Sequence, residues 1–269
     1  MVELKGGAGG MEQTRTDPIA FQRNVILALL IGLSAAAWAL MIWHGAGHDA
    51  HMRMASPTMG LGAPAFVLAW LAMTVAMMFP TAAPMALTFH RLQAARRRRE
   101  QAFVSTWTFL AGYLLVWVAS GAVAYLGAVA AESAAQRLEL SAQATARIGG
   151  AVLIAAGLYQ LTPLKDLCLT KCRSPLTFIM TSWREGTFGA LQMGAIHGAW
   201  CVGCCWLLCA VMFPLGMMNV AALASITLIV FVEKTLPWGA WIAQAAGVLL
   251  LAYGFLVMMS PTTVQIFQS

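Results

Sequence analysis

Long apolar stretches recur along almost the whole chain, separated by short polar segments. A helix that crosses the apolar core of a bilayer needs about 20 such residues. We place candidate spans near residues 25–43, 62–89, 104–130, 147–163, 189–212, 217–235 and 239–259. Only 10% of the 269 residues are charged, whereas soluble domains carry roughly 25%. The sequence therefore predicts an all-α, polytopic transmembrane helix bundle of six or seven spans.

The ends of the chain differ in composition from the part between them. We expect residues 1–24 to form a polar N-terminal segment, residues 25–260 a single transmembrane domain, and residues 261–269 a short C-terminal tail. The apolar stretch 25–43 exceeds the 7 to 15 residues of a usual signal-peptide core, so we interpret it as an uncleaved signal anchor.

Basic residues gather before the first predicted span, after the second and after the fourth. They are Lys5, Arg15 and Arg23, then Arg91 and Arg96 to Arg99, then Lys165, Lys171, Arg173 and Arg184. The positive-inside rule makes these segments cytoplasmic, which predicts a bacterial inner-membrane protein with a cytoplasmic N-terminus and outward-facing loops 44–61 and 131–146. The arginine block lies between two apolar spans, which favours a topology anchor over a nucleic-acid-binding patch.

The second span contains Pro80 and Pro84 within the sequence MMFPTAAPM. Each proline removes one helical hydrogen bond, so we expect a kink or a break there. Such a helix is tolerated in a membrane only where neighbouring groups satisfy the freed backbone.

The fifth span carries most of the chain's candidate chemistry. On a helical wheel its soft side chains fall within an arc of about 160°; they are Met193, His197, Cys201, Cys204, Cys205, Cys209 and Met212. Spacings of four and three residues would present His197, Cys201 and Cys204 on successive turns, as ligands of one metal ion require. Free cysteine is also a common buried hydrophobe, so plain packing is the alternative. Because ionisable groups at membrane depth are costly, the cluster favours metal binding or thiol redox chemistry.

Two further clusters flank the membrane in this interpretation. Cys168 and Cys172, within LTPLKDLCLTKCRSP, follow the fourth span, and nearby cations would raise their thiolate fraction. They would receive or release a soft ion, form a reversible disulfide, or be no more than interfacial cysteines. On the outer side, the segment after the first span contains His44, His48, Asp49, His51, Met52 and Met54. Histidine and methionine suit copper, imidazole with carboxylate suits zinc or nickel, and a solvated polar loop is the other interpretation.

Several sequence motifs resemble the bacterial family known as predicted metal-binding integral membrane proteins. They are MMFPTAAPM, LTPLKDLCLTKCRSP with the downstream WREG, MGAIHGAWCVGCCW, and MMNVAAL followed by EKTLPWG. The resemblance runs from about residue 65 to 255 and implies a membrane-embedded metal site. It implies the signature positions Lys165, Cys168, Cys172, His197, Cys201, Cys204 and Cys205. Cys209 and the histidines from His44 to His51 are particular to this chain.

The leading hypothesis is a membrane protein that binds a thiophilic ion through His197 and the cysteines of the fifth span, with Met73, Met77 and Met193 as further ligand candidates. Ligand softness ranks copper first and zinc second. The role would be transport, storage, or delivery to a periplasmic metallochaperone or cuproenzyme. The alternative is a membrane thiol-disulfide oxidoreductase that uses Cys201 and Cys204, and a copper-dependent oxidase is a third class. No Walker-type glycine loop and no Ser-His-Asp arrangement marks the chain as an ATPase or a hydrolase.

Overall fold

The computed structural model describes residues 18–45, 56–217 and 219–260, and every regular element in these ranges is a helix. The helices are α1 (Pro18–Gly45), α3 (Ala63–Arg98), α4 (Thr106–Arg137), α5 (Ala142–Gln160), α6 (Pro163–Arg173), α7 (Pro175–Ser182), α8 (Gly186–Ala210), α9 (Met212–Leu215), α10 (Val220–Thr235) and α11 (Gly239–Met259). The predicted all-α bundle is confirmed.

Five helical segments in the described part of the chain are long and apolar enough to cross a membrane. They are α1, α3, α4, α8 together with α9, and α11. Helices α5 and α6 pass the same test only as a pair bent by 65°, which raises the number to six. The stretch predicted as a span at 217–235 forms α10, which has 16 residues because Gly216, at a φ of 94°, and the Asn219 cap delay its start. At 1.5 Å per residue it is shorter than a typical hydrocarbon core.

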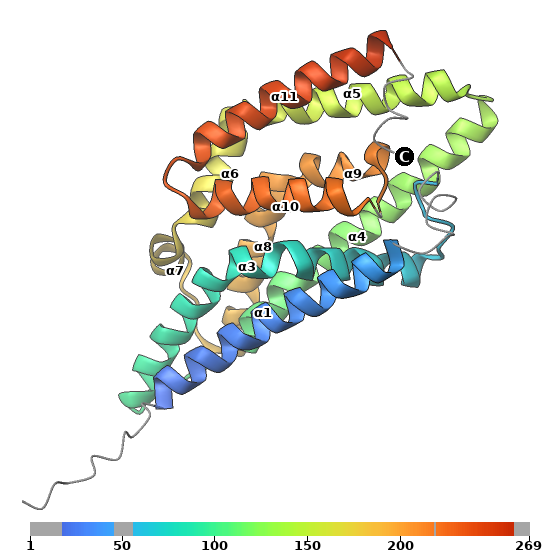
Figure 1. Ribbon diagram of the computed structural model, residues 1–269. Helices are drawn as coiled ribbons and strands as arrows, with labels where there is room; N and C mark the ends of the chain where they lie inside the picture. Colours follow the sequence, from blue (N-terminus) through green and yellow to red (C-terminus); the bar gives the residue numbers. More distant parts are fainter. Residues whose placement is uncertain (1–17, 46–55, 218, 261–269) are drawn as a thin grey trace, which may run out of the picture.

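The bundle is built from three long helix pairs and a central short helix (Figure 1). Helix α1 packs along α3, α4 along α8, and α5 along α11. Helix α10 contacts both α11 and α3, and α6 lies against α8. This arrangement brings α3, α6, α8 and α10 together in the interior, where the candidate site lies.

Helix α3 runs unbroken through both of its prolines, so the predicted break does not occur. Pro80 cannot donate a hydrogen bond to the carbonyl of Ala76, four residues earlier. The hydroxyl of Ser34 in α1 donates to that carbonyl instead, at 2.7 Å. A neighbouring helix therefore satisfies the freed backbone group, as we expected for a proline in a membrane helix.

Small residues let α4 and α8 approach closely. A Cβ atom added at Gly194 would lie 1.9 Å from the carbonyl oxygen of Phe109, and one at Gly112 would lie 2.0 Å from that of Leu191. No side chain fits at either position, so the two backbones are in direct contact. This close crossing fixes the orientation of α8, which carries four of the six cysteines.

The segment after α5 differs from the charged loop that we predicted. Thr162 caps a new helix, α6, by accepting a hydrogen bond from the Lys165 backbone N–H, and Pro163 occupies its first turn. Lys165 is completely buried and forms an ion pair inside the bundle. It is therefore wrong to count Lys165 among the exposed basic residues of a cytoplasmic loop.

Candidate metal centre

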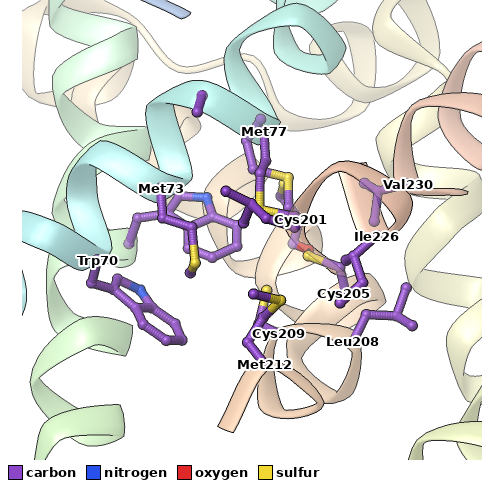
Figure 2. Close-up of a cluster of buried hydrophobic side chains, with 14 of the residues drawn as sticks. Trp70, Met73, Met77, Cys201, Cys205, Leu208, Cys209, Met212, Ile226 and Val230 are labelled. Atoms are coloured by element: carbon purple, nitrogen blue, oxygen red, sulfur yellow. The ribbon is translucent and has the colours of Figure 1, made fainter. Parts of the chain in front are cut away.

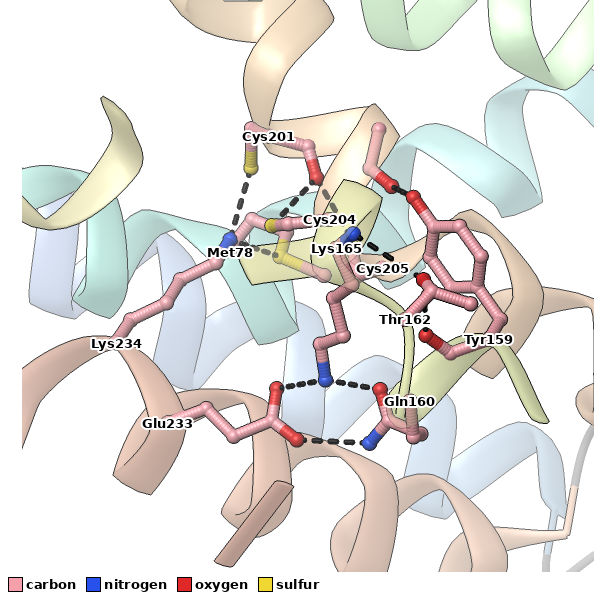
Figure 3. A network of polar contacts seen from close by, with 11 residues as sticks. Met78, Tyr159, Gln160, Thr162, Lys165, Cys201, Cys204, Cys205, Glu233 and Lys234 are labelled. Carbon is pink, nitrogen blue, oxygen red and sulfur yellow. Dashed lines mark hydrogen bonds and ion pairs between the residues drawn. The ribbon is translucent and has the colours of Figure 1, made fainter. Parts of the chain in front are cut away.

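Three thiols of α8 form the centre of the site. Cys201, Cys204 and Cys205 are each at most 2% exposed. The Sγ atoms of Cys204 and Cys205 both donate to the backbone carbonyl of Cys201, at 3.1 and 2.9 Å (Figure 3). Helical spacings of three and four residues place both side chains over the turn that begins at Cys201, so the three sulfur-bearing side chains lie together.

A fourth thiol reaches this group from another helix. Cys172, near the end of α6, lies close enough to exchange a hydrogen bond with the thiol of Cys201 or of Cys204. Cys168, one turn earlier on α6, lies beside Gly203, where an added Cβ atom would be 3.1 Å from its Sγ. The segments LTPLKDLCLTKCRSP and MGAIHGAWCVGCCW, whose cysteines Cys172 and Cys201 are about 30 residues apart in sequence, thus meet in space. We call Cys172, Cys201, Cys204 and Cys205 the thiol cluster.

A half-buried lysine lies against the thiol cluster. The Nζ of Lys234, from α10, donates to the Sγ of Cys201 at 3.0 Å and lies 3.7 Å from the Sδ of Met78 in α3 (Figure 3). Among the described residues Lys234 has no carboxylate partner. The hydroxyl of Tyr113 in α4 is 3.2 Å from the same Cys201 sulfur. Cys201 is therefore contacted by side chains from three other helices, α4, α6 and α10.

Methionines extend the sulfur-rich region toward α3. Met73 and Met77 are at most 2% exposed and belong to the same core as Cys201 and Cys205. Figure 2 shows them facing the cysteines of α8 across the interior of the bundle. Cys209 lies beside Cys205, one turn further along α8, and Met212 follows it. The predicted second-tier ligands Met73 and Met77 are thus near the thiol cluster.

A second buried network lies next to the first. Lys165 of α6 forms an ion pair with Glu233 of α10 at 2.8 Å, and Gln160 of α5 bonds to both of them (Figure 3). All three side chains are at most 2% exposed. Glu233 and Lys234 are consecutive, so one turn of α10 contributes to both networks.

His197 lies one turn before Cys201 on the same face of α8, and Tyr113 contacts both residues. The ring of His197 packs against three aromatic rings, Phe109, Tyr113 and Phe178, at centroid distances of 6.0, 5.6 and 5.5 Å. Its Nδ1 is buried without a hydrogen-bond partner among the described residues. The imidazole therefore has an unused nitrogen inside an aromatic enclosure.

The remaining predicted ligands are not brought to the thiol cluster. Met193 belongs to a separate apolar core, and its Sδ accepts a hydrogen bond from the backbone N–H of Arg184 at 3.4 Å. His44 is exposed in the last turn of α1. His48 and His51 lie outside the described residues.

No group of three or more His, Cys, Asp or Glu side chains within residues 18–45, 56–217 and 219–260 is arranged to hold a metal ion. All six cysteines are free thiols. In this arrangement the thiols of Cys204 and Cys205 donate hydrogen bonds to the Cys201 carbonyl. The donor types nevertheless suit a soft ion, because thiolate and thioether ligands select Cu(I) and zinc.

Sequence reasoning missed Lys234, Tyr113, Met78 and Glu233 as parts of this region. The EKTLPWG segment contained a usable signal, because Glu233 and Lys234 follow an apolar run that continues from 220 to 232. Charged residues at such a position are functional candidates. Tyr113 and Met78 gave no comparable signal, since both residue types are ordinary in apolar helices.

A comparison with protein-family models finds one that covers most of this region. The model described as "PpoB2: Copper chaperone" matches residues 67–257, well over half of the chain. The match includes all six cysteines, His197 and Lys234. No curated protein and no solved structure matches the chain.

Proposed function

The chain belongs to the PpoB2 copper chaperone family, and on that premise we propose that it binds Cu(I) as cargo within the helix bundle and delivers it to a copper protein. The proposed ligands are the thiols of Cys172, Cys201 and Cys204, with Cys205 as a fourth. One observation carries this proposal: Cys172 of α6, which is half-buried, meets the buried cysteines Cys201, Cys204 and Cys205 of α8 in one cluster. Thiols supplied by two helices are the donor set that a soft monovalent ion favours.

Lys234 supports the proposal electrostatically. If two of these thiols ionise and the others bind as neutral thiols, the Cu(I) complex carries a net charge of −1, and an isolated charge in an apolar interior is strongly unfavourable. The ammonium of Lys234, 3.0 Å from the Cys201 sulfur, would neutralise that charge. Lys234 would thus serve as the counter-ion of a bound metal–thiolate group without adding a hard oxygen ligand.

Binding would require a small rearrangement. Cys204 and Cys205 would exchange their hydrogen bonds to the Cys201 carbonyl for the metal, which needs only χ1 rotation. Met77 and Met78 would offer thioethers on one side, and His197 would offer its unpartnered Nδ1 if its ring rotates. Ligands that must rearrange suit an exchangeable cargo site better than a closed structural one.

We further propose that the protein is a multi-pass protein of the bacterial inner membrane with a cytoplasmic N-terminus. The beginning of α1 and the arginine-rich end of α3 lie at the same end of the bundle (Figure 1), which agrees with one cytoplasmic face. The histidine segment that begins at His44 would then face the periplasm. A cuproenzyme or a metallochaperone on that side is the proposed recipient.

The test is Cu(I) binding by the purified protein in detergent under anaerobic, reducing conditions. Affinity would be measured by competition with a chromophoric Cu(I) chelator, and the ligand type by X-ray absorption at the copper edge. Cys172→Ser and Cys201→Ser are expected to lower affinity by more than the roughly 10- to 100-fold that loss of an outer-sphere partner costs. The wild-type spectrum is expected to show sulfur ligands.

Cys209→Ser is the matched control. It changes the same chemical group on the same helix, and Cys209 is as buried as Cys201, at 2% exposed. Its affinity is expected to stay near the wild-type value. Equal affinities for all three variants and the wild type would reject the proposed site. Absence of copper binding together with a Cys201–Cys204 disulfide would instead favour the thiol oxidoreductase.

A further inference from the structure

A row of soft donors leads along α8 into the thiol cluster. Met193, His197 and Cys201 follow one another at spacings of four residues, which places them on one face of the helix in successive turns. All three side chains are at most 3% exposed. Tyr113 connects the last two, because its ring centroid is 5.6 Å from that of His197 and its hydroxyl is 3.2 Å from the Cys201 sulfur. The row therefore begins outside the thiol cluster and ends in it.

A second methionine, from α3, lies in the same buried core as Met193. This core includes Met85 and the rings of Phe109 and Phe178. Both methionines are at most 1% exposed. The ring of His197 contacts two members of the core, Phe109 and Phe178, at centroid distances of 6.0 and 5.5 Å. Two thioethers and one imidazole therefore border a single apolar enclosure.

The Nδ1 atom of His197 is the anomaly in this enclosure. It is buried without a hydrogen-bond partner among the described residues, and such an unsatisfied polar atom is unfavourable. The rings of Phe109 and Phe178 carry no polar group, and the Tyr113 hydroxyl lies against the Cys201 sulfur. A buried water molecule needs about two to four polar partners, which these rings do not supply. A metal ion that the two thioethers also bind would satisfy this nitrogen.

The donor types select the ion. Imidazole and thioether are neutral, and thioether sulfur is a soft ligand that favours Cu(I). Zinc sites in proteins are built from thiolates, imidazoles and carboxylates, and this core contains no cysteine among its described members. The enclosure therefore suits Cu(I) better than zinc.

The enclosure lies toward the arginine-rich end of α3. The Sδ of Met193 accepts a hydrogen bond from the backbone N–H of Arg184 at 3.4 Å. The next residue, Glu185, is exposed and pairs with Arg96 at 2.9 Å. Met193 is thus close to the surface at the end of the bundle that we propose is cytoplasmic, whereas Cys201 lies two turns deeper along α8.

We propose that Met85, Met193 and His197 form a second, weaker Cu(I) site that loads the thiol cluster. The loading role rests on the proposed function of that cluster. Neutral ligands hold Cu(I) less tightly than thiolates do, because a thiolate adds the attraction of opposite charges, so the ion moves from this site to the cluster. A half-turn of His197 about χ2 leaves the plane of its ring, and so its packing against Phe109 and Tyr113, unchanged while Nδ1 turns to the opposite side.

Anaerobic titration of the full-length protein in detergent with Cu(I), read by competition with chromophoric chelators, tests the proposal. The wild type is expected to bind two ions, the second more weakly than the first. Met193→Leu, which nearly conserves volume, and His197→Phe, which keeps an aromatic ring, are each expected to weaken the second ion at least about tenfold. Met41→Leu is the control, because Met41 is 6% exposed and belongs to the other core. Equal affinities of all four proteins for the second ion would overturn the proposal.

A variant without the thiol cluster distinguishes this proposal from the proposed function. It combines Cys172→Ser, Cys201→Ser, Cys204→Ser and Cys205→Ser, and circular dichroism would verify that it is folded. We expect it to bind one Cu(I) with nitrogen and sulfur ligands in X-ray absorption, and to lose that ion when His197→Phe is added. One ion in the wild type and none in the quadruple variant would refute the second site and leave the thiol cluster in place. One ion in each, lost from both with His197→Phe, would refute the thiol cluster and support this site.

Discussion

Two lysines in the interior of this bundle, Lys165 buried and Lys234 half-buried, are satisfied in different ways. Lys165 has a full carboxylate partner in Glu233, and Gln160 completes the network. Lys234 has a thiol and a thioether as its nearest polar partners, Cys201 and Met78. The first network is electrically neutral by itself. The second becomes neutral only when a thiol ionises or when a metal–thiolate group with one net negative charge forms.

The two networks have different roles, one structural and one in the proposed metal binding, although the same turn of α10 contributes to both. A neutral, hydrogen-bonded ion pair holds α5, α6 and α10 in register, which fixes where Cys168 and Cys172 lie. The Lys234 ammonium beside the thiols favours a negatively charged group at the place where we propose that copper binds. Ionisable groups inside a membrane protein are costly, so both lysines require a reason, and the two reasons are different.

The largest expected effect comes from breaking the neutral network. Glu233→Leu leaves the Lys165 ammonium buried without a charged partner, which is expected to destabilise the protein by about 3–5 kcal/mol. Denaturant unfolding in detergent would measure the change. Glu185→Gln, which removes the exposed partner of Arg96, is the comparison and is expected to cost at most about 1 kcal/mol. A loss for Glu233→Leu as small as that for Glu185→Gln would show that Lys165 is not held by this carboxylate.

A double variant tests whether charge explains the stability that Glu233→Leu loses. Adding Lys165→Met to Glu233→Leu removes both charges, and replacing a buried ion pair with apolar groups is often neutral. The double variant is expected to recover most of the stability that the single variant loses, as measured by the same unfolding experiment. A double variant no more stable than the single one would indicate that the network acts through packing and not through charge.

Removing the other lysine is expected to spare folding and impair binding. Lys234→Met keeps the length and the apolar character of the side chain, but it takes the counter-ion away from the proposed metal–thiolate group. We expect Cu(I) affinity to fall at least about tenfold, the lower end of the effect of one neighbouring charge on an ionised group. Lys234→Arg retains the charge and is the control, with chelator competition as the measurement. Equal affinities for the methionine variant and the wild type would refute the counter-ion role.

The smallest effect is expected from Tyr113. Tyr113→Phe removes the hydroxyl 3.2 Å from the Cys201 sulfur and leaves the ring in contact with His197. One hydrogen bond contributes about 1 kcal/mol net, so Cu(I) affinity is expected to change less than tenfold. The same competition assay would detect this change. An effect as large as that of Lys234→Met would mean that the hydroxyl does more than orient one thiol.

The helical periodicity of the fifth predicted span correctly placed its cysteines on one face. That periodicity is a local property, because side chains three and four residues apart share a face in any helix. It could not predict that the cysteines on this face would form the thiol cluster while His197 and Met193 pack among other side chains. That separation depends on which helices pack against each turn of α8, which residues far away in sequence determine.

The burial of Lys165 illustrates the same limit in the fold. From sequence, Lys165 is one of several cations in a polar segment, and the charge rule assigns it to a loop. Its carboxylate partner is 68 residues further along the chain, so no local pattern reveals the pairing. The predicted span at 147–163 likewise gave no sign of the 65° bend, since Thr162 and Pro163 start a helix as readily as they end one.

The hydrogen bond from Ser34 to the Ala76 carbonyl has a consequence for how much of this chain is self-sufficient. The family match begins at residue 67, and α1 ends at Gly45, so the first helix lies wholly outside the matched region. Yet Ser34 of that helix donates a hydrogen bond to the Ala76 carbonyl, which lies inside the matched region and which Pro80 leaves without its helical donor. A chain shortened to the matched residues would leave this carbonyl unpaired in an apolar setting, a cost of about 1–3 kcal/mol. The region matched by the family model therefore relies on α1, which lies outside it, for one of its backbone hydrogen bonds.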